Sequence, residues 1–240
     1  IICDEIQIAA KENQTLRKTF EKAGFYDKTN LLKNDIKIIE FSATPDGTIY
    51  DIMNWKDNSS LIRMEPGDGY TSCFDLFDSG RVFQYQDLCC YNKQIDDIDN
   101  ELVQRNIGDI KTKIELMGYP MYHIIRIPTS TNGEIVVNNF KTIFGDDMMY
   151  KTYDRYSEID NINDILSLKP NNHTFIFIKE KLRCAITLNK KYLGVLYERH
   201  TNNPDDAVII QGLIGRDTGY DNNGSSIIFT NISSIAKYKK

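Results

Sequence analysis

Apolar runs alternate with polar stretches of helical spacing through the second half of the chain. Five of these runs are short and predict strands, at residues 122–128, 148–156, 173–178, 193–197 and 227–230. Between them, residues 131–144 and 160–168 carry apolar side chains at intervals of three and four, which predicts helices. Strands that alternate with helices are typical of a parallel sheet. We therefore predict that residues 118–235 form one complete α/β lobe.

A weaker version of this pattern occupies residues 1–54. Residues 1–3 are an apolar run that we expect to be the end of a buried strand, and residues 36–41 predict a second strand. The polar stretch 15–33 between them has apolar positions that suit a helix followed by a short loop. Strand, helix and strand form one βαβ crossover. We expect residues 1–54 to be the remnant of a first lobe.

Residues 55–117 interrupt the alternation. The first part is rich in Gly, Asp, Ser and aromatic residues and predicts an irregular connector with short strands or turns. Its aromatic side chains could stack on nucleic-acid bases, although packing against the lobes is the commoner role for such residues. Residues 95–117 have helical spacing, closed by Gly118 and Pro120. We predict a connector that ends in a helix.

Composition narrows the possible partners. The chain has 240 residues, of which 41% are hydrophobic, enough for a packed core. It contains no run of about 18 apolar residues, so we expect no membrane span. The net charge of −5 argues against tight non-specific binding to nucleic acid. Phosphate binding depends on local basic patches, however, so nucleic acid is not excluded.

The cysteines and histidines predict no metal centre. The cysteine count is odd and no Cys-x-x-Cys occurs, which argues against a disulfide framework and a zinc site and favours a reducing compartment. The five cysteines are Cys3, Cys73, Cys89, Cys90 and Cys184. Three histidines, His123, His173 and His200, are scattered at predicted strand ends, and we assign them no zinc or general-base role.

Two acidic residues follow the first apolar run. Asp4 and Glu5 would lie at the carboxyl end of a parallel strand, where open α/β sheets bind ligands. Asp4 could then hold Mg²⁺, and Glu5 could orient and deprotonate an attacking water. The alternative is a solvated loop start, which is common after strands.

Two further segments suggest phosphate chemistry. A short apolar helix at 208–214 runs into Gly215 and Arg216, and an arginine there could reach a γ-phosphate across a cleft. The alternative is a surface turn. In the basic segment 179–188, Arg183 and Thr187 are candidates for phosphate contacts. A solvated basic loop explains that segment equally well.

Taken in order, these segments resemble a known family. Asp4-Glu5-x-Gln7, Ser42-Ala43-Thr44 and Gln211…Gly215-Arg216 are similar to motifs II, III and VI of superfamily 2 helicases, the DEAD/DEAH-box-like class. The resemblance extends from residue 1 to about residue 230. It implies RecA-like parallel sheets flanked by helices, with one partial lobe and one complete C-terminal lobe.

The resemblance also implies roles for individual residues. Asp4 would bind Mg²⁺, Glu5 would activate water, and Arg216 would be the arginine finger of the second lobe. Gln7, Gln211 and Gly215 would contact ATP, and residues 179–188 occupy the place of motif V. Gln7, Ser42 and Thr44 would couple the nucleotide state to lobe closure.

Three departures from the family pattern matter. No Gly-x-x-x-x-Gly-Lys-Ser/Thr occurs, so the loop that cradles phosphates is absent from this sequence. The second arginine expected after Arg216 is replaced by Gly219, as in some viral and phage-type members. The spacing from Gln211 to Arg216 is one residue longer than usual, which can displace Gln211. We therefore expect an N-terminally truncated fragment that does not hydrolyse ATP appreciably by itself.

The full protein is predicted to be an ATP-dependent helicase or translocase that moves on nucleic acid, with DNA favoured over RNA. We expect a monomer that binds no membrane and is not secreted, in the cytoplasm or in a viral factory or virion. Two alternatives stay open. One is a DNA-packaging terminase-type motor, and the other is a non-catalytic nucleic-acid-binding or interaction module.

Overall fold

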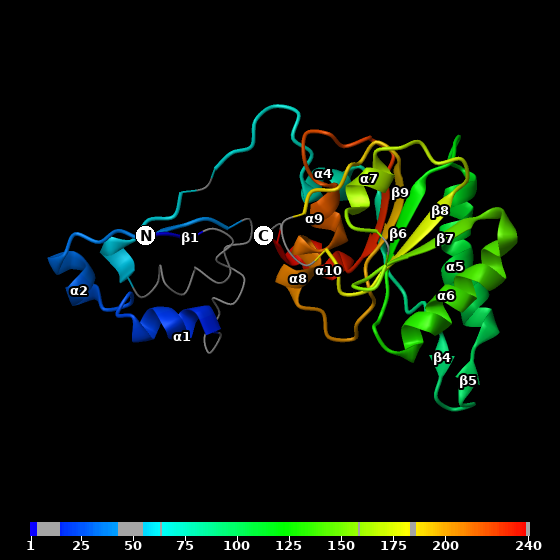
Figure 1. Ribbon diagram of the computed structural model, residues 1–240, viewed down its shortest axis with the longest axis horizontal. Coiled ribbons are helices and arrows are strands. Elements are labelled where there is room, and N and C mark those ends of the chain that lie inside the picture. The colour runs from blue at the N-terminus through cyan, green and yellow to red at the C-terminus, as the bar shows by residue number, and fades with distance from the viewer. Residues whose placement is uncertain (4–14, 43–54, 63, 158, 183–185, 239–240) are drawn as a thin grey trace. The chain divides into compact units, whose positions relative to one another are not determined.

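The computed structural model describes residues 1–3, 15–42, 55–62, 64–157, 159–182 and 186–238. The chain divides into two compact units, residues 1–66 and 67–240 (Figure 1). Among the described residues, no helix is long and apolar enough to cross a membrane.

The first unit contains the predicted βαβ crossover in outline. Strand β1 (Ile2–Cys3) pairs in parallel with β2 (Ile39–Glu40), and Ile2 lies opposite Ile39. Two helices, α1 (Thr15–Lys22) and α2 (Lys28–Lys33), stand where one helix was expected. Gly24, at φ +75°, ends the first helical segment, and the Asp27 carboxylate accepts two backbone N–H groups to start the second.

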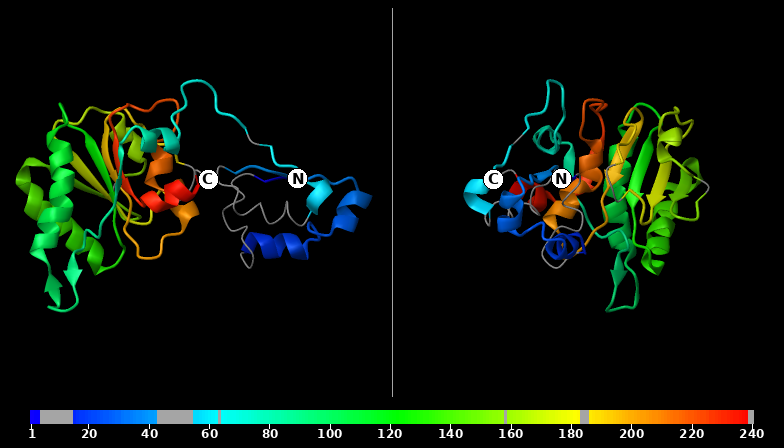
Figure 2. Two further views of the ribbon diagram at one scale, coloured as in Figure 1. Left: turned by 180° about the vertical axis from the view of Figure 1, so that it is seen from behind. Right: turned by 60° about the vertical axis from the view of Figure 1, so that its left-hand side comes forward.

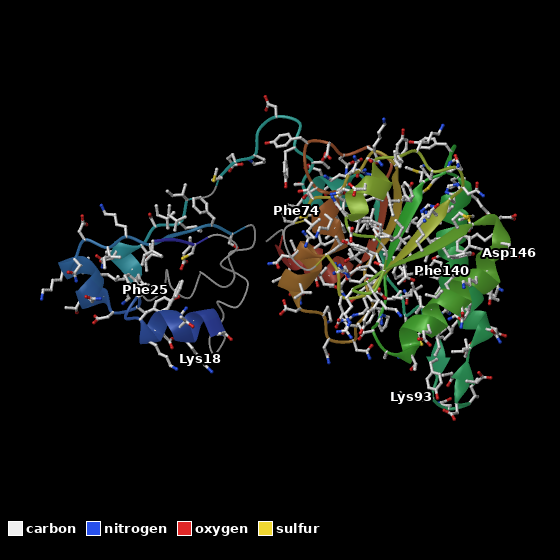
Figure 3. The ribbon with its side chains drawn as sticks, in the orientation of Figure 1. Lys18, Phe25, Phe74, Lys93, Phe140 and Asp146 are labelled. Atoms are coloured by element: carbon white, nitrogen blue, oxygen red, sulfur yellow. The ribbon has the colours of Figure 1, made fainter. Side chains whose placement is uncertain are left out.

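The expectation of a buried first strand is wrong for the residues described. Ile2 is 74% exposed and Ile39 is 51% exposed, because this parallel ladder has two strands in the described part of the unit. In the helical part of this unit Leu31 is buried, and the half-buried rings of Phe20 and Phe25 pack edge to face; Phe25 is labelled in Figure 3. A short 3-10 helix, η1 (Lys56–Asn58), follows later in this unit.

The second unit is built on a six-stranded sheet in which all neighbouring strands are parallel. In spatial order the strands are β3 (Val82–Gln84), β10 (Ile227–Thr230), β9 (Leu193–Tyr197), β6 (Tyr122–Arg126), β8 (Thr174–Ile178) and β7 (Met149–Tyr153). Helices flank this sheet (Figures 1 and 2). The predicted α/β class, with a RecA-like parallel sheet flanked by helices, is confirmed.

Side chains that alternate along the buried strands divide the interior into two cores. Phe175 and Phe177 of β8 belong to a first core, and Ile176 and Ile178 belong to a second core. The first core is covered by α5 (Asn100–Glu115) and α6 (Thr131–Phe144), and Phe140 of α6 packs edge to face on the aromatic rings of β8 (Figure 3). The second core is covered by α4 (Cys73–Asp78), α7 (Ile162–Leu166), α9 (Leu213–Asp217) and α10 (Ile232–Tyr238).

The region expected to be a connector contributes to the second unit. Strand β3 forms one edge of the sheet and α5 covers the first core, so residues 67–117 include integral elements of this unit. The preference for packing over base stacking is confirmed for Phe74 and Phe77, which pack against the second core. A small antiparallel hairpin, β4 (Tyr91–Asn92) with β5 (Asp97–Ile98), precedes α5.

The sheet has a switch point between its central strands. Strand β6 is followed by α6 on the first core. The neighbouring strand β9 is followed by α8 (Asp206–Gln211), which contributes Ile209 to the first core and packs Ile210 against the second, and then by α9 on the second core. Helices α6 and α9, which follow β6 and β9 in the chain, therefore lie on opposite faces of the sheet. In open α/β sheets such divergence leaves a crevice that binds ligands.

Candidate functional site: a cationic cleft at the carboxyl edge of the sheet

A cavity of about 370 Å³ opens at this switch point. It is lined by residues from the ends of β6 and β9, from the segment after β8 and from α8: Arg126, Ile127, Thr129, Glu180, Lys181, Leu182, Arg199, Val208, Gln211 and Gly212. A smaller hollow beside it shares Arg126 and Arg199 and adds Glu198. We call the two together the carboxyl-edge cleft. Its location agrees with the general rule for ligand sites in open α/β sheets.

Glu198 is the buried centre of this cleft. Its side chain lies at the end of β9, and its residue is 4% exposed. Arg126 at the end of β6 donates from Nη1 to both carboxylate oxygens, at 3.1 and 3.2 Å. The backbone N–H of Arg199 donates to Oε1 at 3.0 Å, and that of Leu213 donates to Oε2 at 2.9 Å. One carboxylate therefore joins β6, β9 and α9 where the chain diverges.

Gly212 makes this arrangement possible. It precedes α9 and has no side chain to cap the helix, so the Glu198 carboxylate accepts the N–H of Leu213 in its place. A Cβ at Gly212 would lie 2.3 Å from Glu198 Oε2 and 3.0 Å from the Ile209 carbonyl oxygen. A larger residue would therefore separate α9 from its anchor. Gln211 and Arg216 stand on either side of this fixed turn.

Arg216 points at the segment that follows β8. Its Nη2 donates to the Leu182 carbonyl oxygen at 3.2 Å, and its Nη1 donates to the Ile186 carbonyl oxygen at 3.1 Å. Arg126 also donates to the Leu182 carbonyl oxygen, from Nη2 at 3.1 Å. Two guanidinium groups from different elements thus converge on one uncharged oxygen atom.

The backbone at this oxygen is strained. Glu180 has φ +56° and Leu182 has φ +58°, a left-handed conformation that costs about 1–3 kcal/mol for a residue other than glycine. The Leu182 side chain is buried in the second core, which holds the segment in place. Such strain persists only where the surroundings impose it, and it is often found at ligand sites.

The charges around the cleft favour an anion. Four cationic side chains, those of Arg126, Lys181, Arg199 and Arg216, come from four separate segments of the chain. The carboxylate of Glu198 is buried against Arg126, and two further acidic residues, Glu180 and Asp87, are exposed at the rims of the two hollows. Guanidinium groups suit carboxylate or phosphate oxygens because their donors form a rigid fork.

The structure brings together some of the residues predicted to form the site. Gln211 lines the cleft, and Arg216 contacts the adjoining segment. Gly215 lies one residue before Arg216, and a Cβ there would lie 2.4 Å from the Ile210 carbonyl oxygen, so glycine is required by packing. Thr187 is exposed and does not line the cleft; its carbonyl oxygen accepts a hydrogen bond from Asn163.

The other predicted residues belong to the first unit or lie outside the described residues. Ser42 is half-buried just after β2. Asp4, Glu5, Gln7, Thr44 and Arg183 lie outside the described residues. Among the residues that the structure does describe, no group of three or more His, Cys, Asp or Glu side chains could hold a metal ion.

Two histidines that looked scattered in the sequence are in contact. His123 Nε2 lies 2.9 Å from His173 Nδ1, and His123 Nδ1 accepts the Val195 N–H at 3.0 Å. These contacts place the proton of His123 on Nε2, from which it donates to His173. Burial lowers the pKa of His123 well below its ordinary value, with the neighbouring His173 as a second cause, and burial lowers that of His173. Both residues therefore favour the neutral form, and neither lines the cleft.

Comparison with known proteins identifies a viral relative but indicates no activity for this chain. No family model matches the chain. Over 169 residues it is 31% identical to "Uncharacterized protein L594" of Acanthamoeba polyphaga mimivirus. The match covers 65% of this chain and 38% of the mimivirus protein, so the chain spans well under half of that relative's length.

Proposed function

We propose that this chain is part of an ATP-dependent helicase or translocase of the superfamily 2 class, and that its second unit is the second RecA-like lobe. One observation carries the proposal most directly. The segment after β8, which the resemblance equates with motif V, is bonded at Leu182 and Ile186 to Arg216, which the resemblance equates with the arginine finger. Two weak sequence matches thus meet at the carboxyl edge of a parallel sheet.

The charge of the cleft supports a phosphorylated ligand. ATP would supply the phosphoryl group, and the chain's own residues would bind and orient its charge. Arg216 would stabilise negative charge that develops during phosphoryl transfer. Asp4 and Glu5 are proposed for Mg²⁺ and for water activation. Gln7, Gln211 and Gly215 are proposed for nucleotide contacts, and Ser42 with Thr44 for coupling.

Nucleic acid is the proposed second ligand, with DNA favoured over RNA. The net charge of the chain is −5, but the cationic side chains gather locally around the cleft. Thr187 and Arg183 remain candidates for phosphate contacts. Four cysteines, Cys3, Cys73, Cys89 and Cys90, are free thiols, which supports an intracellular, reducing location. The similarity to a mimivirus protein supports a viral origin.

The test is Mg²⁺-dependent ATP hydrolysis by the intact protein that contains this chain, with and without single-stranded DNA. Arginine fingers contribute about 10³–10⁵ in rate, so we expect Arg216→Gln to lower the DNA-stimulated rate by at least about a hundredfold. Arg105→Gln removes the same charge at an exposed residue of α5 that does not line the cleft, and should leave the rate unchanged.

Three outcomes separate the hypotheses. Hydrolysis that requires DNA and Arg216 supports the proposal. DNA binding without any hydrolysis by the intact protein would favour the non-catalytic module instead. Robust hydrolysis by the 240-residue chain alone would contradict the expectation that its activity requires a phosphate-cradling loop, which this sequence lacks.

A further inference from the structure

The position of the missing second arginine cannot serve the cleft. Gly219 has φ +131° and pairs with Thr71 through two backbone hydrogen bonds of 2.9 and 3.0 Å. A Cβ at Gly219 would lie 3.2 Å from Asp221 Oδ1 and 3.3 Å from Lys190 Nζ. Lys190 lies three residues before the start of β9, at the opposite edge of the sheet from the cleft. An arginine at position 219 would therefore be strained and crowded by a buried cation.

Arg126 provides a cation that could replace it. Its Nη2 and the Nη2 of Arg216 lie 3.1 and 3.2 Å from the same carbonyl oxygen, that of Leu182. Arg126 lines both hollows of the cleft. It comes from the end of β6, ninety residues before Arg216 in the chain, so no sequence motif around Arg216 would reveal it.

We propose that Arg126 is a second phosphate-binding arginine of this site, and that it acts with Arg216 on one phosphoryl group. This inference rests on the proposed function, because Arg216 is the shared residue. It names the ligand by its chemistry, a phosphoryl oxyanion, whose source is either a nucleotide or a nucleic-acid backbone. The Leu182 carbonyl oxygen occupies the position of that oxyanion in the structure described here.

The electrostatics favour exchange of this carbonyl for an anion. A carbonyl oxygen is a neutral acceptor, and two guanidinium groups that share it repel each other. Hydrogen bonds to a charged phosphoryl oxygen are roughly twice as strong as those to a neutral acceptor. Release of the carbonyl would also free the strained backbone at Glu180 and Leu182 to relax.

Glu198 positions Arg126 for this role. It binds Nη1 through both carboxylate oxygens and so leaves Nη2 directed at Leu182. A lysine at position 126 would keep the charge but has no fork to bond Glu198 and a phosphoryl oxygen together. Glu198 is therefore a positioning residue, and Arg126→Lys should behave as a loss of function.

The experiment titrates the 240-residue chain with tripolyphosphate, Mg²⁺-free ATP and a deoxythymidine oligonucleotide, followed by calorimetry and by the arginine Nε–H signals in NMR spectra. We expect tripolyphosphate to bind and to shift the Arg126 and Arg216 signals. Arg126→Gln, Arg126→Lys and Arg216→Gln should each weaken binding at least tenfold. Arg105→Gln should change the affinity less than twofold.

A second variant guards against misfolding. Arg126→Gln with Glu198→Gln removes both charges of the buried pair, so that no carboxylate remains unpaired. It should fold, as judged by circular dichroism, and bind as weakly as Arg126→Gln alone. Full affinity in this double variant, or no binding of any probe by the unmodified chain, would overturn the inference.

The comparison of ATP with the oligonucleotide identifies the source of the phosphoryl group. Hydrolysis by the intact protein separates this inference from the proposed function. Stronger dependence on Arg126 for ATP than for the oligonucleotide assigns the site to the nucleotide, and the reverse assigns it to the nucleic-acid backbone. If hydrolysis by the intact protein requires Arg216 but is unaffected by Arg126→Gln, the inference fails and the proposed function stands. If Arg126 binds tripolyphosphate but the intact protein hydrolyses no ATP, the proposed function fails and the site stands.

Discussion

The two edges of the six-stranded sheet use buried charge in different ways. At the carboxyl edge, Arg126 and Glu198 form a pair whose side chains are 18% and 6% exposed, and both border a cavity. At the amino edge, Lys190 has a fully buried side chain and bonds Asp221, whose side chain is 59% exposed. Both side chains of the carboxyl-edge pair are therefore largely buried, whereas in the amino-edge pair only that of Lys190 is.

The two ion pairs also differ in the hydrogen bonds made by the polar groups around them. Amino-edge polar groups bond mainly to one another: Arg81 donates to Asn222 and Ser226, and Asp217 accepts from both of those residues. Carboxyl-edge cations instead meet at a carbonyl oxygen beside open space. The amino edge therefore closes the fold, whereas the carboxyl edge leaves its guanidinium groups beside a cavity, where we propose that a phosphoryl ligand binds.

The largest expected effect is at Glu198. Glu198→Ala would leave Arg126 buried without its partner and remove the carboxylate that anchors Leu213 at α9. Breaking a buried pair in this way costs about 3–5 kcal/mol of unfolding free energy. Urea unfolding followed by circular dichroism measures the change. Glu198→Gln, which keeps an acceptor of similar shape, should lose clearly less, and equal losses would contradict the role of charge.

The next effect tests the glycine between α8 and α9. Gly212→Ala places a methyl group 2.3 Å from Glu198 Oε2, and forced shifts of this kind typically cost about 1–3 kcal/mol. Gly108→Ala in α5 is the matched control because no atom lies within 4 Å of its added Cβ. That helical control should gain about 0.5–1 kcal/mol. Equal stability changes in the two variants would show that Gly212 does not hold α9 against Glu198.

Acid should weaken the second unit through its histidine pair. The folded-state pKa values of His123 and His173 are lowered, so the unfolded chain binds more protons once the pH falls below about 6.5. The stabilisation is fully present above that pH and is lost as pH falls, by up to about 1.4 kcal/mol per pH unit for each histidine. Urea unfolding between pH 7.5 and 5.5 measures this, and His123→Phe should flatten the profile. An unchanged profile in that variant would exclude His123 as a cause.

Much of this fold could be predicted from the sequence, because helices and strands are specified by patterns among residues that are neighbours in the chain. The helix predicted at 131–144 and the strands predicted at 193–197 and 227–230 have the predicted bounds. The two-lobe helicase assignment remains a prediction. The residues of the cleft were harder to predict from the sequence, because Arg126 and Glu198 are 72 residues apart and meet only through the β6–β9 pairing. Arg216 was a candidate through its motif, but its partner Leu182 had no signal of its own.

The smallest expected effect would sharpen the contrast between the edges. Lys190→Met replaces a buried ammonium with an apolar side chain of similar length, and the freed Asp221 carboxylate is already more than half exposed to water. Replacing a buried ion without leaving its partner buried is often neutral or stabilising. We therefore expect a change of within about 1 kcal/mol in unfolding free energy and unchanged tripolyphosphate affinity. A loss as large as that of Glu198→Ala would mean that the amino edge depends on its ion pair as strongly as the cleft does, and that open space rather than charge distinguishes the two edges.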